Sequence, residues 1–191
     1  MVGGLRGPPL VGTIVERTRP SIAVAMARPR RTRYATANDI LASARECGCD
    51  RKSFRQLPGQ RALKLLDRIL GAFTVGGLRN RKAMWLWEDF RGPEFSVQGP
   101  HDLDDLLSLG PGETPVWLVV EDRHRAKRGT AFWIFEGTLA STIATLSNSF
   151  CIEFYIVGRS FDWLIAENHH EYLIAVGDRA VAALKRLAPR C

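Results

Sequence analysis

The chain has 191 residues, of which 46% are hydrophobic and 25% charged, as in an ordinary folded domain. No run of about 18 apolar residues is present, which excludes a membrane-spanning helix. Four cysteines are too few for a small disulfide-stapled protein. The formal net charge is +7, yet residues 1–33 hold seven arginines and one glutamate, whereas the remaining 158 residues hold 20 basic and 19 acidic side chains. Attraction of nucleic acid by charge would therefore depend on the N-terminal segment.

Residues 1–33 are predicted to be a disordered tail rich in arginine, proline and glycine. Met26 is an alternative start, in which case residues 1–25 would be translated upstream sequence. An organelle transit peptide is disfavoured because the prolines would interrupt its amphipathic helix. Residues 34–191 are predicted to form a single α+β domain.

The first half of this domain contains two predicted helices. Asn38 can cap a helix that continues to about residue 47, and residues 48–59 are expected to be a connection. Residues 60–73 carry apolar side chains at helical spacing, with charged residues on the other face. The glycine pair Gly76-Gly77 follows this amphipathic helix.

Strand patterns dominate the rest of the chain. The segment 116–121 (VWLVVE) is almost wholly apolar, as expected for a central strand that is buried on both faces. The other expected strands are 83–88, 131–136, 152–157, 161–167 and 172–176, and the expected helices are a short one from Asp102, one starting at Thr138 and one over 178–187.

This order of elements predicts the α+β class. We expect a single mixed, largely antiparallel sheet, with the N-terminal helices and the C-terminal helix packed against it. The β-α-β passage through residues 131–157 could form one parallel pair of strands. Eight of the 17 aromatic residues lie within residues 132–163, which indicates that the core is centred there.

The most polar cluster beside an apolar strand is Glu167-Asn168-His169-His170-Glu171, which follows the strand that contains Trp163. Two imidazoles and two carboxylates could bind zinc or exchange protons. Adjacent residues of an extended chain point to opposite faces, so the two histidines are not expected to share a metal ion unless the segment turns. A polar turn between strands, a recognition surface and a catalytic site all remain open, and no catalytic residue, metal or cofactor is assigned.

Three other clusters are expected to be structural. Cys47 and Cys49 lack a second CxxC or CxxH pair and are predicted to be free thiols. Asp102, Asp104 and Asp105 depart from the spacing of a calcium loop and are better explained as acids at a helix N-terminus. The basic loop Arg123–Arg128 could hold a phosphate backbone, but charged hairpin tips are common.

The stretch IEFYIVGRSFDWLIAENHHEYLIAVG resembles the C-terminal signature of a family of small, uncharacterised bacterial α+β proteins. In this signature an EFYIV strand is followed by WL, ENHH and an apolar strand that ends in glycine. The resemblance covers about residues 83–187 and implies a cytosolic protein without an established activity; some similar proteins resemble immunity proteins of bacterial toxin systems. The residues that carry it are Glu153, Phe154, Tyr155, Ile156, Val157, Trp163, Leu164, Glu167, Asn168, His169, His170 and Gly177.

The resulting hypothesis is a cytoplasmic, non-enzymatic protein that binds another protein, such as a toxin domain, and no membrane. Its predicted binding residues are Trp163, Glu167, Asn168, His169, His170 and Glu171. A hydrolase or metal enzyme that uses the Glu167–Glu171 cluster is the second hypothesis. A nucleic-acid binder that uses the tail and the Arg123–Arg128 loop is the third. The near-neutral charge of residues 34–191 argues against inhibition of a strongly basic nuclease.

Overall fold

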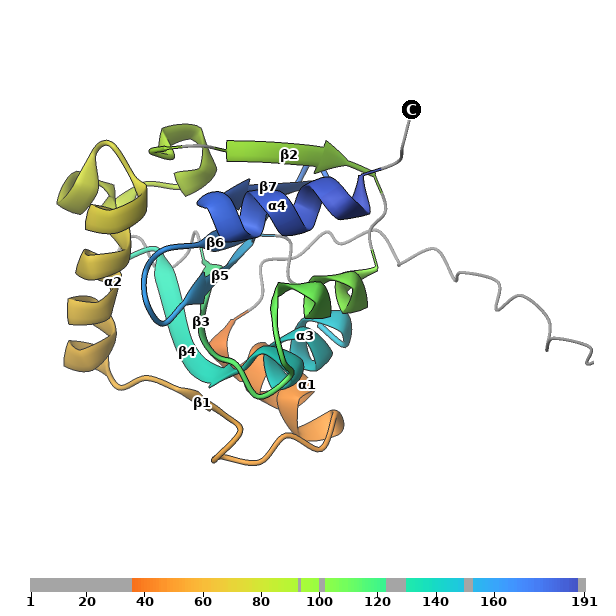
Figure 1. Ribbon diagram of the computed structural model, residues 1–191. Coiled ribbons are helices and arrows are strands. Elements are labelled where there is room, and N and C mark those ends of the chain that lie inside the picture. The colour runs from red at the N-terminus through yellow and green to blue at the C-terminus, as the bar shows by residue number, and fades with distance from the viewer. Residues whose placement is uncertain (1–35, 93, 100–101, 123–129, 150–152, 189–191) are drawn as a thin grey trace, which may run out of the picture.

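The structure is a computed structural model that describes residues 36–92, 94–99, 102–122, 130–149 and 153–188. One seven-stranded sheet has helices on both faces, which confirms the predicted α+β class (Figure 1). The predicted tail and the Arg123–Arg128 loop lie outside the described residues. No helix in the described part of the chain is long and apolar enough to cross a membrane.

Every pair of neighbouring strands is antiparallel, in the order β1-β4-β3-β5-β6-β7-β2. The sheet is therefore not mixed, and the parallel pair predicted within residues 131–157 is wrong. Helix α3 (Leu139–Ser147) does connect two parallel strands, but these lie on either side of β3 and both pair with it. The strands are β1 (Phe54–Gln56), β2 (Glu94–Gln98), β3 (Pro115–Glu121), β4 (Phe132–Thr138), β5 (Phe154–Gly158), β6 (Leu164–Glu167) and β7 (Tyr172–Val176).

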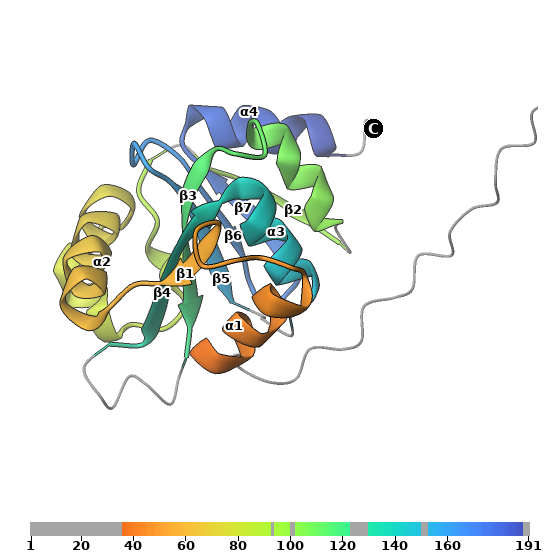
Figure 2. The same ribbon diagram turned by 90° about the horizontal axis from the view of Figure 1, so that it is seen from below.

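One face of the sheet is covered by four helical elements (Figure 2). These are α1 (Ala37–Glu46), α3, α4 (Asp178–Leu187) and the short 3₁₀ helix η3 (Leu103–Leu109). They pack on alternate strand residues such as Leu118 and Ile156, since successive side chains of a strand point to opposite faces.

The opposite face is covered by α2 (Gly59–Phe73) and by the 3₁₀ helix η2 (Leu86–Asp89). These elements pack on the other set of strand residues, including Trp117 and Tyr155. Because both faces are covered, Val116–Val120 is buried along its whole length, as its apolar sequence predicts. We refer to this face as the α2 face.

The helix boundaries follow local capping signals. Thr36, and not the predicted Asn38, caps α1: its side chain accepts a hydrogen bond from the backbone N–H of Asp39, whose carboxylate accepts one in return. Thr138 caps α3 as predicted and forms the equivalent box with Ser141. Helix α4 spans the residues expected for it.

The strand predicted over residues 83–88 is wrong. The chain there passes from one 3₁₀ helix, η1 (Gly77–Lys82), into η2, and Trp85 between them adopts a left-handed conformation with φ of 63°. Two short edge strands were missed instead. Strand β1 has three residues, too few for a pattern, and β2, which pairs with β7, lies in a segment for which no strand was predicted.

Candidate functional site

The predicted cluster 167–171 lies in the turn between β6 and β7, and Asn168 organises this turn. The buried carboxamide oxygen of Asn168 accepts hydrogen bonds from the backbone N–H groups of His170 (3.0 Å) and Tyr172 (3.1 Å). The N–H of Glu171 donates to the Asn168 carbonyl, and Glu171 takes a left-handed conformation with φ of 61°. Asn168 therefore acts on the shape of the turn, which presents His170 and Glu171 at the surface.

Trp163 does not lie on this turn. It precedes β6 at the opposite end of that strand, and it is only 1% exposed. A Cβ atom at Gly158 would come within 2.3 Å of the Trp163 indole nitrogen, so the ring packs directly on the backbone there. Trp163 is a core residue on the face of α1, α3 and α4, away from the turn that carries residues 167–171.

His169 is held by the carboxylate of Glu153, which the sequence indicated only as part of the strand signature and not as a binding residue. Both the backbone N–H and the imidazole Nδ1 of His169 hydrogen-bond to Oε1 of Glu153. The Glu153 side chain is 0% exposed and that of His169 is 30% exposed. Glu153 reaches this position because its neighbour Phe154 on β5 pairs with Glu167 on β6. The Glu153 carboxylate orients the imidazole ring of His169 through Nδ1, so that Nε2 is the ring nitrogen that does not contact Glu153.

Two tryptophans from the segment around η2 lie against the histidines. The ring centroid of Trp85 is 5.7 Å from that of His169, and the ring centroid of Trp87 is about 6 Å from both imidazoles (6.2 Å and 6.1 Å). The two imidazoles are 4.0 Å apart, because the chain turns here and is not extended. We call Trp85, Trp87, His169 and His170 the Trp–His surface.

Glu121, at the end of β3, supports this surface from below. Its buried carboxylate accepts hydrogen bonds from the backbone N–H groups of Trp85 (2.9 Å) and Leu86 (3.4 Å), and from the hydroxyl of Tyr155 (2.5 Å). Burial and the negative charge of Glu121 raise the pKa of Tyr155 well above its ordinary value, so the hydroxyl remains a donor. The left-handed conformation of Trp85, costly for a bulky residue, is thus held by a buried acceptor.

Comparison with known families assigns the chain to one of them. A model of a family of unknown function, DUF6756, matches residues 34–188. The chain belongs to this family. No curated protein and no solved structure shows a significant match. The match to DUF6756 includes every residue of the Trp–His surface and both supporting glutamates.

The sequence contained a signal for one of the missed residues but not for the others. Both β5 and β6 were predicted, and pairing them across the turn at 158–160 would have placed Glu153 beside the polar cluster. Trp85 and Trp87 were assigned to a strand, which hid their approach to a turn more than 80 positions away. Glu121 was seen only as the end of a buried strand.

The structure also places the residues considered for metal binding and two of the clusters expected to be structural. Within the described ranges, no group of three or more His, Cys, Asp or Glu side chains is arranged to hold a metal ion. Asp102 caps η3 through a hydrogen bond from the N–H of Asp104, in agreement with the helix-terminus interpretation. Cys47 and Cys49 are free thiols, and the pKa of Cys47 is raised by partial burial and by its neighbours Cys49 and Glu46.

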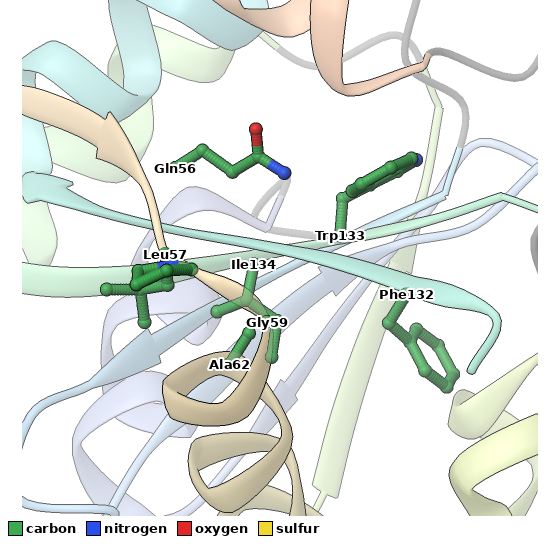
Figure 3. A pocket seen from close by; sticks show the side chains of 8 residues that line it. Gln56, Leu57, Gly59, Ala62, Phe132, Trp133 and Ile134 are labelled. Atoms are coloured by element: carbon green, nitrogen blue, oxygen red, sulfur yellow. The ribbon is translucent and has the colours of Figure 1, made fainter. Parts of the chain in front are cut away.

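A pocket of about 310 Å³ lies apart from these residues, beside the first turn of α2 (Figure 3). Leu57, Ala62 and Ile134 lie on the α2 side of strand β4, whereas Gln56 and Trp133 lie on the other side. None of the predicted site residues lines this pocket. Its lining is Gln56, Leu57, Pro58, Gly59, Ala62, Phe132, Trp133 and Ile134.

Proposed function

We propose that this chain binds another protein through the Trp–His surface, as an immunity-type protein of a bacterial toxin system. The observation that carries the proposal is that two tryptophans and two histidines from distant segments meet in one patch, of which His170 is exposed and the other three are half-buried. Tryptophan is enriched among the residues that dominate the binding energy of protein interfaces.

The surface is held in place before any partner arrives. Glu121 fixes the backbone at Trp85, and Glu153 fixes both the backbone and the ring of His169. A side chain that is already ordered loses less conformational entropy on binding, which favours affinity.

The charge near the surface favours a cationic partner. Glu88 and Glu171 are exposed on the two segments that carry the rings, and Glu121 and Glu153 lie buried beneath them. These carboxylates can attract a basic partner although residues 34–191 are nearly neutral as a whole, since complementarity acts through the contact surface. A basic toxin domain is the class of partner that fits.

The test begins with the genes that flank this one. We expect a neighbouring gene for a large secreted protein with a C-terminal toxin domain, and the purified domain is then titrated with the full chain by calorimetry. Trp87→Ala should weaken binding by about 30-fold or more, as expected for a residue that dominates an interface. Because Trp87 also packs on the core, the exposed His170→Ala keeps the test interpretable and should weaken binding without loss of fold.

Leu107→Ala is the matched control, because Leu107 is an exposed apolar residue on η3, on the other face of the sheet. It should bind the toxin domain as the unmodified chain does. Unchanged affinity in both Trp87→Ala and His170→Ala, or flanking genes without any toxin, would refute the proposal.

The Glu153–His169 pair supports a second candidate, a hydrolase with His169 as general base. A buried carboxylate on Nδ1 is the arrangement that orients a catalytic imidazole and stabilises its protonated form. This form of the hypothesis replaces Glu167 with Glu153 as the acidic partner. It predicts saturable hydrolysis of an ester probe such as p-nitrophenyl acetate that is lost in His169→Gln. A rate equal in both proteins would reject it.

A further inference from the structure

A second buried carboxylate, Glu136 on β4, is surrounded by arginines at the other end of the α2 face. Its Oε1 accepts from Nε of Arg55 on β1 at 2.5 Å. Its Oε2 lies 3.5 Å from Nη2 of Arg61 on α2 and 3.4 Å from Nη2 of Arg159 in the turn after β5. The Glu136 side chain is 7% exposed, whereas those of the three arginines are 55%, 59% and 35% exposed.

One carboxylate does not satisfy three guanidinium groups. Each guanidinium carries five N–H donors and one positive charge, and each of these three makes only one contact with Glu136. A fourth arginine, Arg68, lies over the ring of Phe161 in the same turn as Arg159, and this turn also contains Asp162. Four arginines and two carboxylates leave a local charge of +2.

Arg159 is the most constrained member of this group. Its guanidinium carbon lies 3.4 Å from the centroid of the Trp117 ring, and its buried Nε has no acceptor among the described residues. Partial burial lowers the pKa of Arg159, the charge of Glu136 and the hydrogen bond to it oppose this shift, and the neighbouring Arg61 and Arg55 add to it. A partly buried guanidinium in such a position is incompletely neutralised, and an additional anion would stabilise it.

The N-terminus of α2 adds further positive charge near these arginines. The helix begins at Gly59 after Pro58, with no side-chain cap and no acidic residue in its first turn. Arg61 occupies that turn instead, although the positive end of a helix dipole favours an anion.

We propose that Arg55, Arg61 and Arg159 form a binding site for a phosphoryl group on the outer side of Glu136. A phosphate carries about −1.5 to −2 charges at neutral pH and has three acceptor oxygens. It would therefore match both the excess charge and the fork geometry of the exposed guanidiniums. A single carboxylate from an acidic peptide would neutralise only half of the excess. The site lies at the opposite end of the sheet from the Trp–His surface and is independent of the function proposed there.

The test is a titration of the full chain with potassium phosphate, with ionic strength held constant by potassium chloride. The arginine Nε–H signals are followed by two-dimensional NMR, and those of Arg55, Arg61 and Arg159 should shift and saturate. Arg61→Gln should weaken phosphate binding by about tenfold or more, since it removes charge-assisted hydrogen bonds. Arg55→Gln should do the same. The control Arg186→Gln removes one exposed charge from α4, on the other face, and should leave phosphate binding unchanged.

The source of the phosphoryl group is resolved by a second probe, adenosine monophosphate. Tighter binding than inorganic phosphate assigns the site to a nucleotide, and equal binding assigns it to free phosphate; both support the proposal. Three results overturn it: shifts that do not saturate, equal weakening by Arg186→Gln, or a diglutamate peptide that binds more tightly than phosphate.

Discussion

Both ends of the sheet bury carboxylates on the α2 face, but they stabilise them in different ways. At the Trp–His end, Glu121 and Glu153 accept hydrogen bonds from backbone N–H groups, a tyrosine hydroxyl and an imidazole. At the α2 N-terminal end, Glu136 is held by the guanidiniums of three arginines. The first arrangement leaves negative charge beneath an aromatic surface, and the second leaves excess positive charge.

This contrast shows that a domain with almost no net charge can contain regions of different local charge. In residues 34–191 the basic side chains outnumber the acidic ones by only one. The net charge alone therefore does not indicate any charged region in this domain. The two ends nevertheless differ in the partners of their buried carboxylates, because Glu121 and Glu153 lie at one end of the sheet, whereas β1, α2 and the turn after β5 bring arginines to Glu136 at the other. Partner chemistry follows from local charge of this kind.

The largest expected effect comes from removing the acceptor at the Trp–His end. Glu121→Ala leaves the backbone N–H of Trp85 and the Tyr155 hydroxyl without their shared acceptor, whereas the N–H of Leu86 keeps the Tyr155 hydroxyl oxygen at 3.1 Å. We expect the free energy of unfolding to fall by about 3–5 kcal/mol. Urea denaturation measures it, with the exposed Glu113→Ala as a control that should change by less than about 0.5 kcal/mol. A loss below about 1 kcal/mol for Glu121→Ala would show that Glu121 does not support this end.

The arginine end should respond less strongly and should depend on salt. Glu136→Gln keeps the size of the side chain but leaves Arg55, Arg61 and Arg159 to repel one another. We expect a loss of about 1–2 kcal/mol at roughly 0.05 M salt that shrinks at about 1 M, because exposed charges are screened. The same variant should bind phosphate more tightly. A loss that is equal at both salt concentrations would remove the electrostatic distinction between the two ends.

The pH dependence of stability tests the contribution of the Tyr155 hydroxyl, the neutral donor to Glu121 at the Trp–His end. Tyr155 ionises more readily in the unfolded chain, near its ordinary pKa of 10.0, than in the folded protein, where burial and Glu121 raise its pKa. The unfolded state therefore loses a proton first, and the stabilisation by Tyr155 is present below pH 10 and declines above it. We expect Tyr155→Phe to cost about 1 kcal/mol at pH 8 and the difference from the unmodified protein to shrink above pH 10. Denaturation at several pH values tests this, and a difference that grows with pH would contradict it.

Much of the fold could be predicted because the pattern of local residues determines it. The apolar run Val116–Val120 indicated a central strand, and the period of residues 60–73 indicated α2. The errors fall where distant contacts decide. Residues 83–88 have the composition of a strand, but hydrogen bonds to Glu121, some 35 positions away, hold Trp85 and Leu86 in a different conformation. Strand β2 depends on its pairing with β7, which no local pattern shows.

The candidate site was predictable only in part, for the same reason. His169 and His170 stood out because polar residues interrupt two apolar strands. Trp163 also stood out, but the identity of a residue does not tell which face of the sheet it occupies, and its ring lies in the core. The arginine cluster around Glu136 could not be seen at all, because Arg55, Arg61 and Arg159 are scattered over more than 100 positions in elements whose pairing was unknown.

The smallest expected effect on stability is that of His170→Ala. Comparison with His169→Ala tests which histidine of the Trp–His surface stabilises the fold and which is free to bind a partner. His170 is exposed, and its ring lies beside the rings of His169 and Trp87 at the surface, so His170→Ala should change the free energy of unfolding by less than about 0.5 kcal/mol. His169→Ala should cost about 1 kcal/mol or more, because it deprives the buried Glu153 of a side-chain donor. Parallel urea denaturation of the two variants measures the difference. If His170→Ala is as destabilising as His169→Ala, the rings form a structural unit, and a loss of partner binding in His170→Ala could no longer be attributed to recognition.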